Sequence, residues 1–236
     1  PTLEQLRERI SEVFGFETLR PLQAEAMEAS LAGRDALVVL PTGGGKSLCY
    51  QAPALVLPGF TLVVSPLIAL MADQLHSLEG HGVAAGVVNS AQAADLRSET
   101  WRRLRAGELD LLYCAPERLG VPGFVDDLVA AGCSAIAIDE AHCISHWGHD
   151  FRPEYRQLAT LRERFPDVSV RAFTATATER VRDDIVEQLG LRDPARLVGD
   201  FDRPNLVYRV LPRTDARGQI GEALGRHKGE ASIVYC

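Results

Sequence analysis

Short runs of apolar, largely β-branched residues recur along the chain, separated by longer segments with helical periodicity. The apolar runs lie at 36–40, 61–65, 109–114, 134–139 and 168–174. They are too short for helices and too apolar for half-exposed strands, which is typical of strands buried on both faces of a parallel sheet. The helical patterns lie at 47–56, 67–79, 91–106, 154–164 and 177–189. This alternation predicts a doubly wound α/β domain, with a mostly parallel sheet and helices on both faces.

Both ends of the chain depart from this alternation. Two helices are expected before the first strand, because Thr2 and Gln5 make a capping box and Pro21 suits the first turn of a second helix. Glycine, aspartate and proline interrupt the periodicity at 199–206 and predict a domain boundary. Beyond it we expect the truncated start of a second domain, with a strand, a helix and a strand at 206–211, 215–227 and 232–236.

The composition is that of an ordinary globular protein, with 46% hydrophobic and 24% charged residues. No apolar stretch reaches the ~18 residues that a membrane helix needs, and no segment resembles a signal peptide. The five cysteines form no CxxC pair and are expected to be reduced and intracellular. A net charge of −7 argues against a protein that simply coats nucleic acid, but permits an enzyme with a local basic track. The basic cluster at 101–105 is better explained as the solvated face of a helix.

The stretch ALVVLPTGGGKSLCYQ at 36–51 runs from a strand through a glycine cluster into a helix. Glycines let backbone N–H groups converge on an anion, and a helix N-terminus adds partial positive charge. In such a loop Lys46 reaches the β- and γ-phosphates and Ser47 ligates Mg²⁺. Leu40 stands where the general GxxxxGKS pattern has its first glycine. The alternative, a glycine-rich turn with a surface lysine, fits the flanking strand and helix less well. We expect nucleotide contacts from Thr42, Gly43, Gly44, Gly45, Lys46 and Ser47.

The segment AIAIDEAH at 135–142 provides two carboxylates where a strand ends. In α/β proteins, ligands bind at this edge of the sheet. We expect Asp139 to hold Mg²⁺ through water and Glu140 to polarise the water that attacks the γ-phosphate. Alone, such a pair is often part of a solvated loop. Together with the phosphate-binding loop it predicts nucleoside triphosphate hydrolysis, with Lys46, Asp139 and Glu140 as the catalytic residues.

Seven motifs resemble, in order, those of the RecQ DNA helicases, which belong to the DEAD/DEAH-like helicase superfamily. They are FGFETLRPLQ (14–23), LPTGGGKSLCYQ (40–51), VVSPLIALMADQ (63–74), YCAPERL (113–119), DEAHCISHWGHDFRPEY (139–155), FTATAT (173–178) and FDRPNL (201–206). The resemblance covers essentially the whole chain. It implies a RecA-like P-loop NTPase fold, ATP and Mg²⁺ as cofactors, and single-stranded and forked duplex DNA as partners. It also implies 3′→5′ movement with duplex unwinding, in DNA repair and recombination.

The same resemblance implies roles for residues outside the phosphate-binding loop. Phe16, Arg20 and Gln23 match the family's adenine-recognition motif. A glutamine amide can both donate to and accept from adenine, and an aromatic ring and a guanidinium can pack on its faces. The implied DNA-binding and coupling residues are Pro66, Leu67, Gln74, Trp147, Phe151, Arg152, Thr174 and Thr176. For the two threonines, capping of the next helix is the alternative.

The segment CISHWGHDFRPEY at 143–155 resembles the family's aromatic-rich loop, which senses single-stranded DNA and couples it to ATP hydrolysis. Trp147 and Phe151 offer stacking surfaces, worth ~1–3 kcal/mol per base in such sites. Arg152 can contact a phosphate or an acidic neighbour. A core position for the two aromatic residues is the alternative, although Gly148 and Asp150 break any regular period.

A second alternative for this region is a metal site. Its ligands would be His142, Cys143, His146 and His149. We disfavour it, because the cluster directly follows the carboxylates expected to bind Mg²⁺ and lacks a HExxH arrangement.

These features predict the first lobe of an ATP-dependent DNA helicase, a DNA-stimulated ATPase. We expect N-terminal helices with the adenine motif at 1–33, the RecA-like lobe at 34–200, and a linker with the start of a second lobe at 201–236. The family's arginine finger, zinc-binding and winged-helix regions lie outside this chain, which is therefore expected to be inactive alone. The protein is expected to be cytoplasmic and nucleoid-associated in a bacterium, or nuclear in a eukaryote, and not in a membrane.

Two alternative functions stay open. An RNA helicase of the same superfamily is disfavoured by the loop at 143–155. A non-catalytic, ATP-gated DNA-binding module is disfavoured by Lys46, Asp139 and Glu140, which are all intact.

Overall fold

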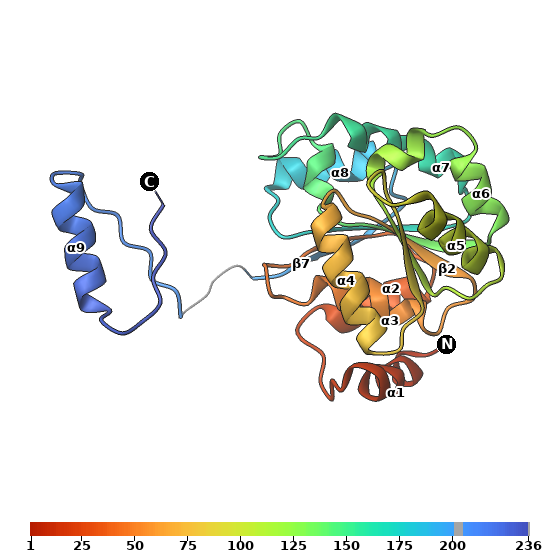
Figure 1. Cartoon of the computed structure of the whole chain (residues 1–236), viewed down its shortest axis with the longest axis horizontal. Helices are drawn as coiled ribbons and strands as arrows, with labels where there is room; N and C mark the ends of the chain where they lie inside the picture. Colours follow the sequence, from red (N-terminus) through yellow and green to blue (C-terminus); the bar gives the residue numbers. More distant parts are fainter. Residues whose placement is uncertain (201–204, 236) are drawn as a thin grey trace. The chain divides into compact units, whose positions relative to one another are not determined.

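The structure is a computed structural model that describes residues 1–200 and 205–235. The chain forms two compact units, Pro1–Phe201 and Asp202–Cys236. The first contains a parallel sheet of seven strands in the order β3-β4-β2-β5-β6-β1-β7. Helices surround this sheet (Figure 1). The strands are β1 (Ala36–Val39), β2 (Phe60–Val64), β3 (Ala85–Val88), β4 (Leu111–Cys114), β5 (Cys133–Ile138), β6 (Ser169–Thr174) and β7 (Ala195–Val198). This sheet confirms the predicted α/β class.

Helices cover both faces of the sheet. They are α1 (Leu3–Phe14), α2 (Gln23–Leu31), α3 (Lys46–Ala54), α4 (Ile68–Gly80), α5 (Ala94–Arg105), α6 (Phe124–Ala130), α7 (Leu161–Arg164) and α8 (Glu179–Gln188), with 3₁₀ helices η1 (Pro116–Gly120), η2 (Ala141–Ile144) and η3 (Pro153–Thr160). Leu37 and Val39 of β1 face a core shared with α5 to α8. Ala36 and Val38 face α2, α3 and α4, with α1 packed outside α2 and α3. Alternating residues of a central strand therefore serve two separate cores.

Of the two predicted starts of the N-terminal helices, one is confirmed and one is wrong. Thr2 and Gln5 form the predicted capping box of α1, each donating its backbone N–H to the other's side chain. Pro21 does not begin the second helix. It lies in a turn closed by the N–H of Gln23 donating to the Arg20 carbonyl at 3.1 Å, and Leu22 has a left-handed φ of 65°. The helix starts only after that turn, so Gln23 is its first residue.

Three elements of the first unit were missed by the sequence patterns, namely β3, α6 and β7. β3 is an edge strand with a glycine inside it, which weakens a strand pattern. The structure needs that glycine, because a Cβ on Gly86 would lie 2.9 Å from Thr100 Cγ2 of α5. β7 is the opposite edge strand and alternates between half-buried and exposed residues. The helix predicted at 154–164 is mostly 3₁₀ and becomes α-helical only at Leu161.

The second unit contains α9 (Ala216–Arg226), which matches the helix predicted at 215–227. Within the described residues of this unit, 206–211 and 232–235 form no strand, while Cys236 and part of the predicted boundary, 201–204, lie outside them. A strand requires a neighbour to complete its backbone hydrogen bonds, and none is present for these segments in the described part of the unit. Across residues 1–200 and 205–235, no helix is long and apolar enough to cross a membrane.

Candidate functional site

The phosphate loop, residues 40–47, joins β1 to α3 and depends on glycines. Gly43 and Gly45 have φ values of 79° and 81°, a region that residues with a Cβ rarely adopt. A Cβ on Gly44 would lie 2.8 Å from the Pro41 carbonyl oxygen. Gly45 is the N-cap of α3, which begins at Lys46. The glycine-rich loop therefore runs directly into the N-terminus of a helix. This arrangement exposes backbone N–H groups that bind anions.

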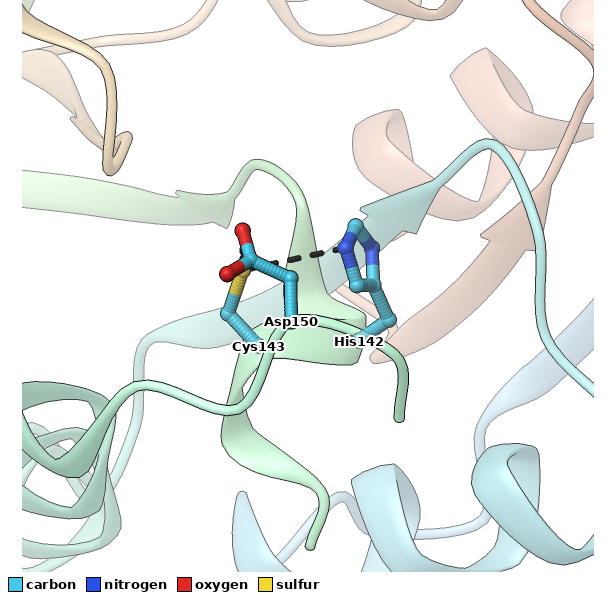
Figure 2. A group of neighbouring side chains, drawn as sticks. All are labelled: His142, Cys143 and Asp150. Carbon is cyan, nitrogen blue, oxygen red and sulfur yellow. Dashed lines mark hydrogen bonds between the residues drawn. The ribbon is translucent and has the colours of Figure 1, made fainter. Parts of the chain in front are cut away.

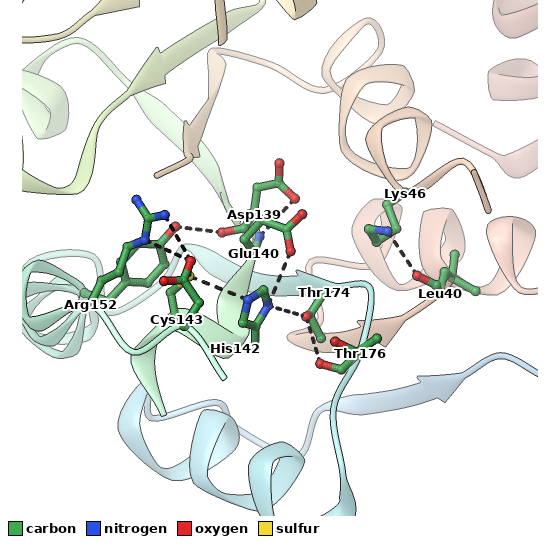
Figure 3. A network of polar contacts seen from close by, with 11 residues as sticks. Leu40, Lys46, Asp139, Glu140, His142, Cys143, Arg152, Thr174 and Thr176 are labelled. Atoms are coloured by element: carbon green, nitrogen blue, oxygen red, sulfur yellow. Dashed lines mark hydrogen bonds and ion pairs between the residues drawn. The ribbon is translucent and has the colours of Figure 1, made fainter. Parts of the chain in front are cut away.

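The Lys46 side chain folds back over the phosphate loop. Its Nζ donates to the Leu40 carbonyl at 3.0 Å (Figure 3). The Leu40 side chain is buried, and its φ is not positive, so the loop does not need a glycine there. Thr42 is exposed in the loop, and Ser47 follows half-buried in the first turn of α3.

The two carboxylates of the DEAH segment follow β5 directly. Asp139 is 7% exposed, and its backbone N–H donates to the Val64 carbonyl at 2.8 Å. Its own carbonyl accepts from the Tyr155 hydroxyl at 2.9 Å. Burial, and next the neighbouring Glu140 carboxylate, raise the pKa of Asp139 to about 6, against an opposing effect of Lys46. This site therefore holds negative charge that a cation would stabilise.

Glu140 sits at a sharp change of chain direction. Its φ of 47° and ψ of 45° are left-handed, which is uncommon for a residue with a side chain. Its N–H donates to Asp139 Oδ1 at 3.0 Å, which holds the bend. The backbone thus turns away from the sheet and continues into η2, so the two adjacent carboxylates are held in a fixed geometry.

His142 connects this carboxylate pair to the end of β6. Its Nδ1 lies 3.3 Å from Glu140 Oε2 and 2.8 Å from Thr174 Oγ1 (Figure 3). Thr174 in turn donates to the Thr176 carbonyl at 3.3 Å. Burial lowers the pKa of His142, so the ring is neutral near pH 7. The sequence had offered His142 only as a metal ligand, although its position two residues after Glu140 was a usable signal.

Neither Thr174 nor Thr176 caps the helix that follows. The N-cap of α8 is Thr178, whose Oγ1 accepts from the Val181 N–H at 3.4 Å. The capping alternative is therefore wrong for both residues. Thr174 is fully buried at the carboxyl end of β6, which pairs in register with β1 through Val39. The ends of β1, β5 and β6 thus meet around the phosphate loop, Asp139 and Thr174.

Two of the three adenine-motif residues, Arg20 and Gln23, bond the phosphate loop. Gln23 is 3% exposed, and its Nε2 donates to the Gly45 carbonyl at 3.0 Å while its Oε1 accepts from the Arg20 N–H at 2.7 Å. Arg20 also donates through Nη1 to the Gly43 carbonyl. Phe16 is 52% exposed and lines, with Arg20, a pocket of about 450 Å³. Arg20 and Gln23 thus lie at the loop, and Phe16 lies beside Arg20 in the pocket.

The first group of predicted DNA residues lies between β2 and α4. Leu67 is the N-cap of α4 and is 43% exposed. The Pro66 carbonyl accepts from Arg152 Nη1 at 3.1 Å, which ties this turn to the aromatic loop. Gln74 is turned inward, with its Oε1 accepting from Gln51 Nε2 at 2.6 Å. Two of the three residues therefore face solvent or the loop, whereas Gln74 already has a partner on α3.

The aromatic loop, residues 143–152, carries the second group. Trp147 is 59% exposed, so the core alternative is wrong for it. The Arg180 guanidinium lies over its ring, with Cζ 3.2 Å from the ring centroid. Phe151 is half-buried and stacks on His146 at 4.0 Å between centroids. Arg152 pairs with Asp150 at 3.0 Å. Arg180 was not singled out from the sequence, where it is one basic residue of an amphipathic helix.

The four residues of the disfavoured metal alternative do not converge. His146 contacts Arg156 and Phe151, and His149 stacks on the His142 ring at 4.4 Å. Instead, His142 and Cys143 lie with Asp150, which the sequence had not suggested as a ligand (Figure 2).

A sequence model of the family described as DEAD/DEAH box helicase matches residues 20–185, and the chain belongs to this family. Within it, the RecQ DNA helicase of Haemophilus influenzae is 44% identical over 96% of this chain and 37% of that protein. The helicase SGS1 of Saccharomyces cerevisiae is 42% identical over the whole chain and 17% of that protein. The resemblance to the RecQ helicases is thereby confirmed. The chain spans less than two fifths of the length of these relatives.

Solved structures share the fold. The helicase MrfA bound to DNA and AMPPNP superposes with a TM-score of 0.71 at 19% identity, covering 96% of this chain and 34% of that one. A hypothetical ATP-dependent RNA helicase from Sulfolobus tokodaii gives a TM-score of 0.63 at 19% identity, covering 83% of this chain and 57% of that one. These neighbours show that the chain has an α/β fold of RecA-like architecture.

Proposed function

We propose that this chain is the first, ATP-binding lobe of a RecQ-type DNA helicase that uses ATP and Mg²⁺. The whole protein would translocate 3′→5′ on single-stranded DNA and unwind forked duplexes, in DNA repair and recombination. The observation that carries the proposal is the convergence of Lys46, the Asp139–Glu140 pair and Thr174 at one edge of the sheet, with the aromatic loop starting three residues beyond Glu140. Membership of the DEAD/DEAH box helicase family and the RecQ relatives support the same function.

The site fits a magnesium–nucleotide complex. The phosphate loop offers a glycine backbone at a helix N-terminus, and Asp139 is a buried carboxyl whose charged form is disfavoured by burial and by Glu140. Ser47 and Asp139 would hold the metal, which supplies charge neutralisation at the phosphates. Lys46 would exchange its contact with the Leu40 carbonyl for the β- and γ-phosphates. Glu140 would accept a hydrogen bond from the attacking water and so orient it.

DNA would reach this chemistry through the aromatic loop. A base stacked on Trp147 would shift a loop that is joined to the site at two points. One point is the chain itself, which runs from Glu140 through η2 into the loop. The other is Arg152, which bonds both Asp150 and the Pro66 carbonyl. His142 would transmit a shift to Glu140, because its Nδ1 lies between Glu140 and Thr174.

The domain assignment belongs to the same proposal. Residues 1–33 would supply adenine recognition, 34–200 the lobe, and 201–236 a linker and the start of a second lobe. A protein of this kind would work where DNA is found: in the cytoplasm at the nucleoid of a bacterium, or in a eukaryotic nucleus.

The deciding experiment is a steady-state ATPase assay of the full-length protein, without nucleic acid, with single-stranded DNA and with single-stranded RNA of the same length. We expect hydrolysis that single-stranded DNA stimulates far more than RNA does. Stimulation by RNA alone would favour an RNA helicase. ATP binding with no turnover under any condition would favour a non-catalytic, ATP-gated module.

Replacing Gln23 by alanine should reduce selectivity for adenine. Loss of one amide that pairs with the base should raise the KM for ATP roughly 3- to 10-fold, the worth of one hydrogen bond, with little change for GTP or UTP. Gln188→Ala, on the exposed end of α8, is the matched control. KM values for the three nucleotides are the measurement. Parallel changes for ATP and GTP would show that Gln23 supports the loop through Gly45 and does not read the base.

Replacing Trp147 by alanine should weaken coupling between DNA and hydrolysis. Loss of a stacking surface worth ~1–3 kcal/mol should raise the DNA concentration for half-maximal ATPase stimulation roughly 5- to 150-fold. Basal ATPase should fall much less, because Trp147 is exposed and outside the core. Trp147→Phe, which keeps an aromatic face, should recover most of the stimulation. Equal losses of basal and stimulated activity would mean that the indole only supports the fold.

A further inference from the structure

We propose that His142, Cys143 and Asp150 form a second metal site, which binds a soft divalent cation of the Zn²⁺ class. The ligand atoms of these residues all lie within 4.8 Å of one another (Figure 2). Cys143 Sγ is 3.8 Å from His142 Nε2 and 3.8 Å from Asp150 Oδ2. The site is distinct from the Mg²⁺ position at Ser47 and Asp139, which offers only oxygen ligands.

The spacing suits tetrahedral coordination. Zinc lies about 2.3 Å from a cysteine sulfur and about 2.0–2.1 Å from a histidine nitrogen, so its ligands stand roughly 3.5 Å apart. The two sulfur-centred distances exceed this by only a few tenths of an ångström. The remaining pair, His142 and Asp150, lies within 4.8 Å, so side-chain movements of about an ångström would close the site.

His142 is already oriented as a ligand. Its Nδ1 is engaged by Glu140 and Thr174, and its Nε2 faces the Cys143 sulfur. Histidines that bind metals characteristically use one ring nitrogen for the metal and the other for a carboxylate or similar partner, which fixes the ring. His142 and Cys143 are both buried, whereas Asp150 is exposed. The cation would enter from the Asp150 side, where water can complete the coordination.

The donor set selects the metal. A thiolate and an imidazole favour zinc and similar ions, whereas Mg²⁺ takes oxygen ligands and keeps its water. Millimolar Mg²⁺ in an ATPase assay should therefore not fill this site. The two metal positions would be linked through Glu140, whose side chain contacts His142 and whose carbonyl accepts from the Cys143 N–H.

Binding would have a consequence for coupling, and this consequence rests on the proposed function. Asp150 Oδ2 now accepts two hydrogen bonds from Arg152, which also holds the Pro66 carbonyl. A cation on Asp150 would compete with that guanidinium and release Arg152. At the same time it would fix His142 against Glu140. The aromatic loop would then be locked to the hydrolytic site, and DNA could no longer shift it.

The binding test needs no activity. The purified 236-residue chain, free of tags, Mg²⁺ and nucleotide, is titrated with Co²⁺, which reports a cysteine ligand by a thiolate-to-metal charge-transfer band. We expect the band, and its loss on adding Zn²⁺. Cys143→Ser should abolish it. Cys133→Ser, which changes another buried cysteine at the opposite end of β5 from Asp139, should keep it. No band, or the same band in Cys143→Ser, would overturn the site.

A second variant keeps the metal site testable if Cys143→Ser fails to fold. Asp150→Asn changes an exposed residue and should weaken Co²⁺ binding by about tenfold or more, the scale on which metal sites respond to loss of a supporting group. Unchanged affinity would remove Asp150 from the site. In the full-length protein, Zn²⁺ should suppress DNA-stimulated ATPase reversibly in the wild type and not in Cys143→Ser. Equal suppression of both would overturn the regulatory step, while the Co²⁺ band would still decide the site.

Discussion

Replacing Lys46 by alanine in the full-length protein is expected to reduce kcat for ATP hydrolysis by roughly 10²–10³-fold, the scale on which loss of one donor to a developing charge acts. Lys46 is the first residue of α3, and its Nζ already bonds a backbone carbonyl of the phosphate loop. Alanine keeps the helix and removes the cation that we propose to contact the phosphates. Duplex unwinding should disappear with hydrolysis. DNA binding should largely persist, because the aromatic loop and the turn at Pro66 are unchanged.

The chain offers a close control for this experiment. It contains only two lysines, and the other, Lys228, is exposed in the second unit. Lys228→Ala should leave phosphate release and unwinding unchanged. If Lys46→Ala turns over ATP like the wild type, the phosphate loop has been assigned wrongly, and the nucleotide site must be sought elsewhere.

Replacing Glu140 by glutamine should separate nucleotide binding from hydrolysis. The amide preserves the size of the side chain but cannot accept a proton or polarise water as a carboxylate does. We expect kcat to fall by roughly 10²–10³-fold, the cost of removing one group that acts on the transition state. ATP affinity should be retained or rise, because removing the Glu140 charge relieves repulsion of Asp139.

Affinity for a fluorescent ATP analogue and single-turnover phosphate release measure the two effects separately. Glu163→Gln, an exposed glutamate of α7, is the matched control and should behave as the wild type. A variant that loses both binding and turnover would point to a collapse of the left-handed bend at Glu140. Wild-type turnover would mean that another group orients the water.

The elements that carry chemistry were the ones that the sequence predicted best. Two buried strands of the sheet centre, β1 and β5, are largely apolar runs; glycines follow β1 closely and two carboxylates follow β5 directly. The edges were harder to predict. β3 needs Gly86 for close packing, and β7 is only half-buried, so neither has the pattern of a buried strand. A pattern of hydrophobicity reports burial, and edge strands are buried too little to be detected.

The residues of the candidate site also fall into two groups, those that the sequence could place and those that it could not. Lys46, Asp139 and Glu140 could be placed because their positions are fixed by sequence distance from a strand end. Contacts across the fold could not be read from the chain. Examples are the bond from Gln23 to the Gly45 carbonyl and the neighbourhood of Cys143 and Asp150. Such pairs depend on how side chains pack, which no spacing along the sequence encodes.

Arg180 affects how long a base stays bound to the aromatic loop. Its guanidinium already covers one face of the Trp147 ring, so a base that stacks on that face must replace a contact. Base stacking worth ~1–3 kcal/mol is then offset by a lost cation–π contact of about 0.5–1 kcal/mol. The net gain is smaller than stacking on an uncovered face would give, so a base stays on that face for a shorter time. In the proposed helicase, contacts with the strand would have to be released at every step, and return of Arg180 to the vacated ring would favour each release.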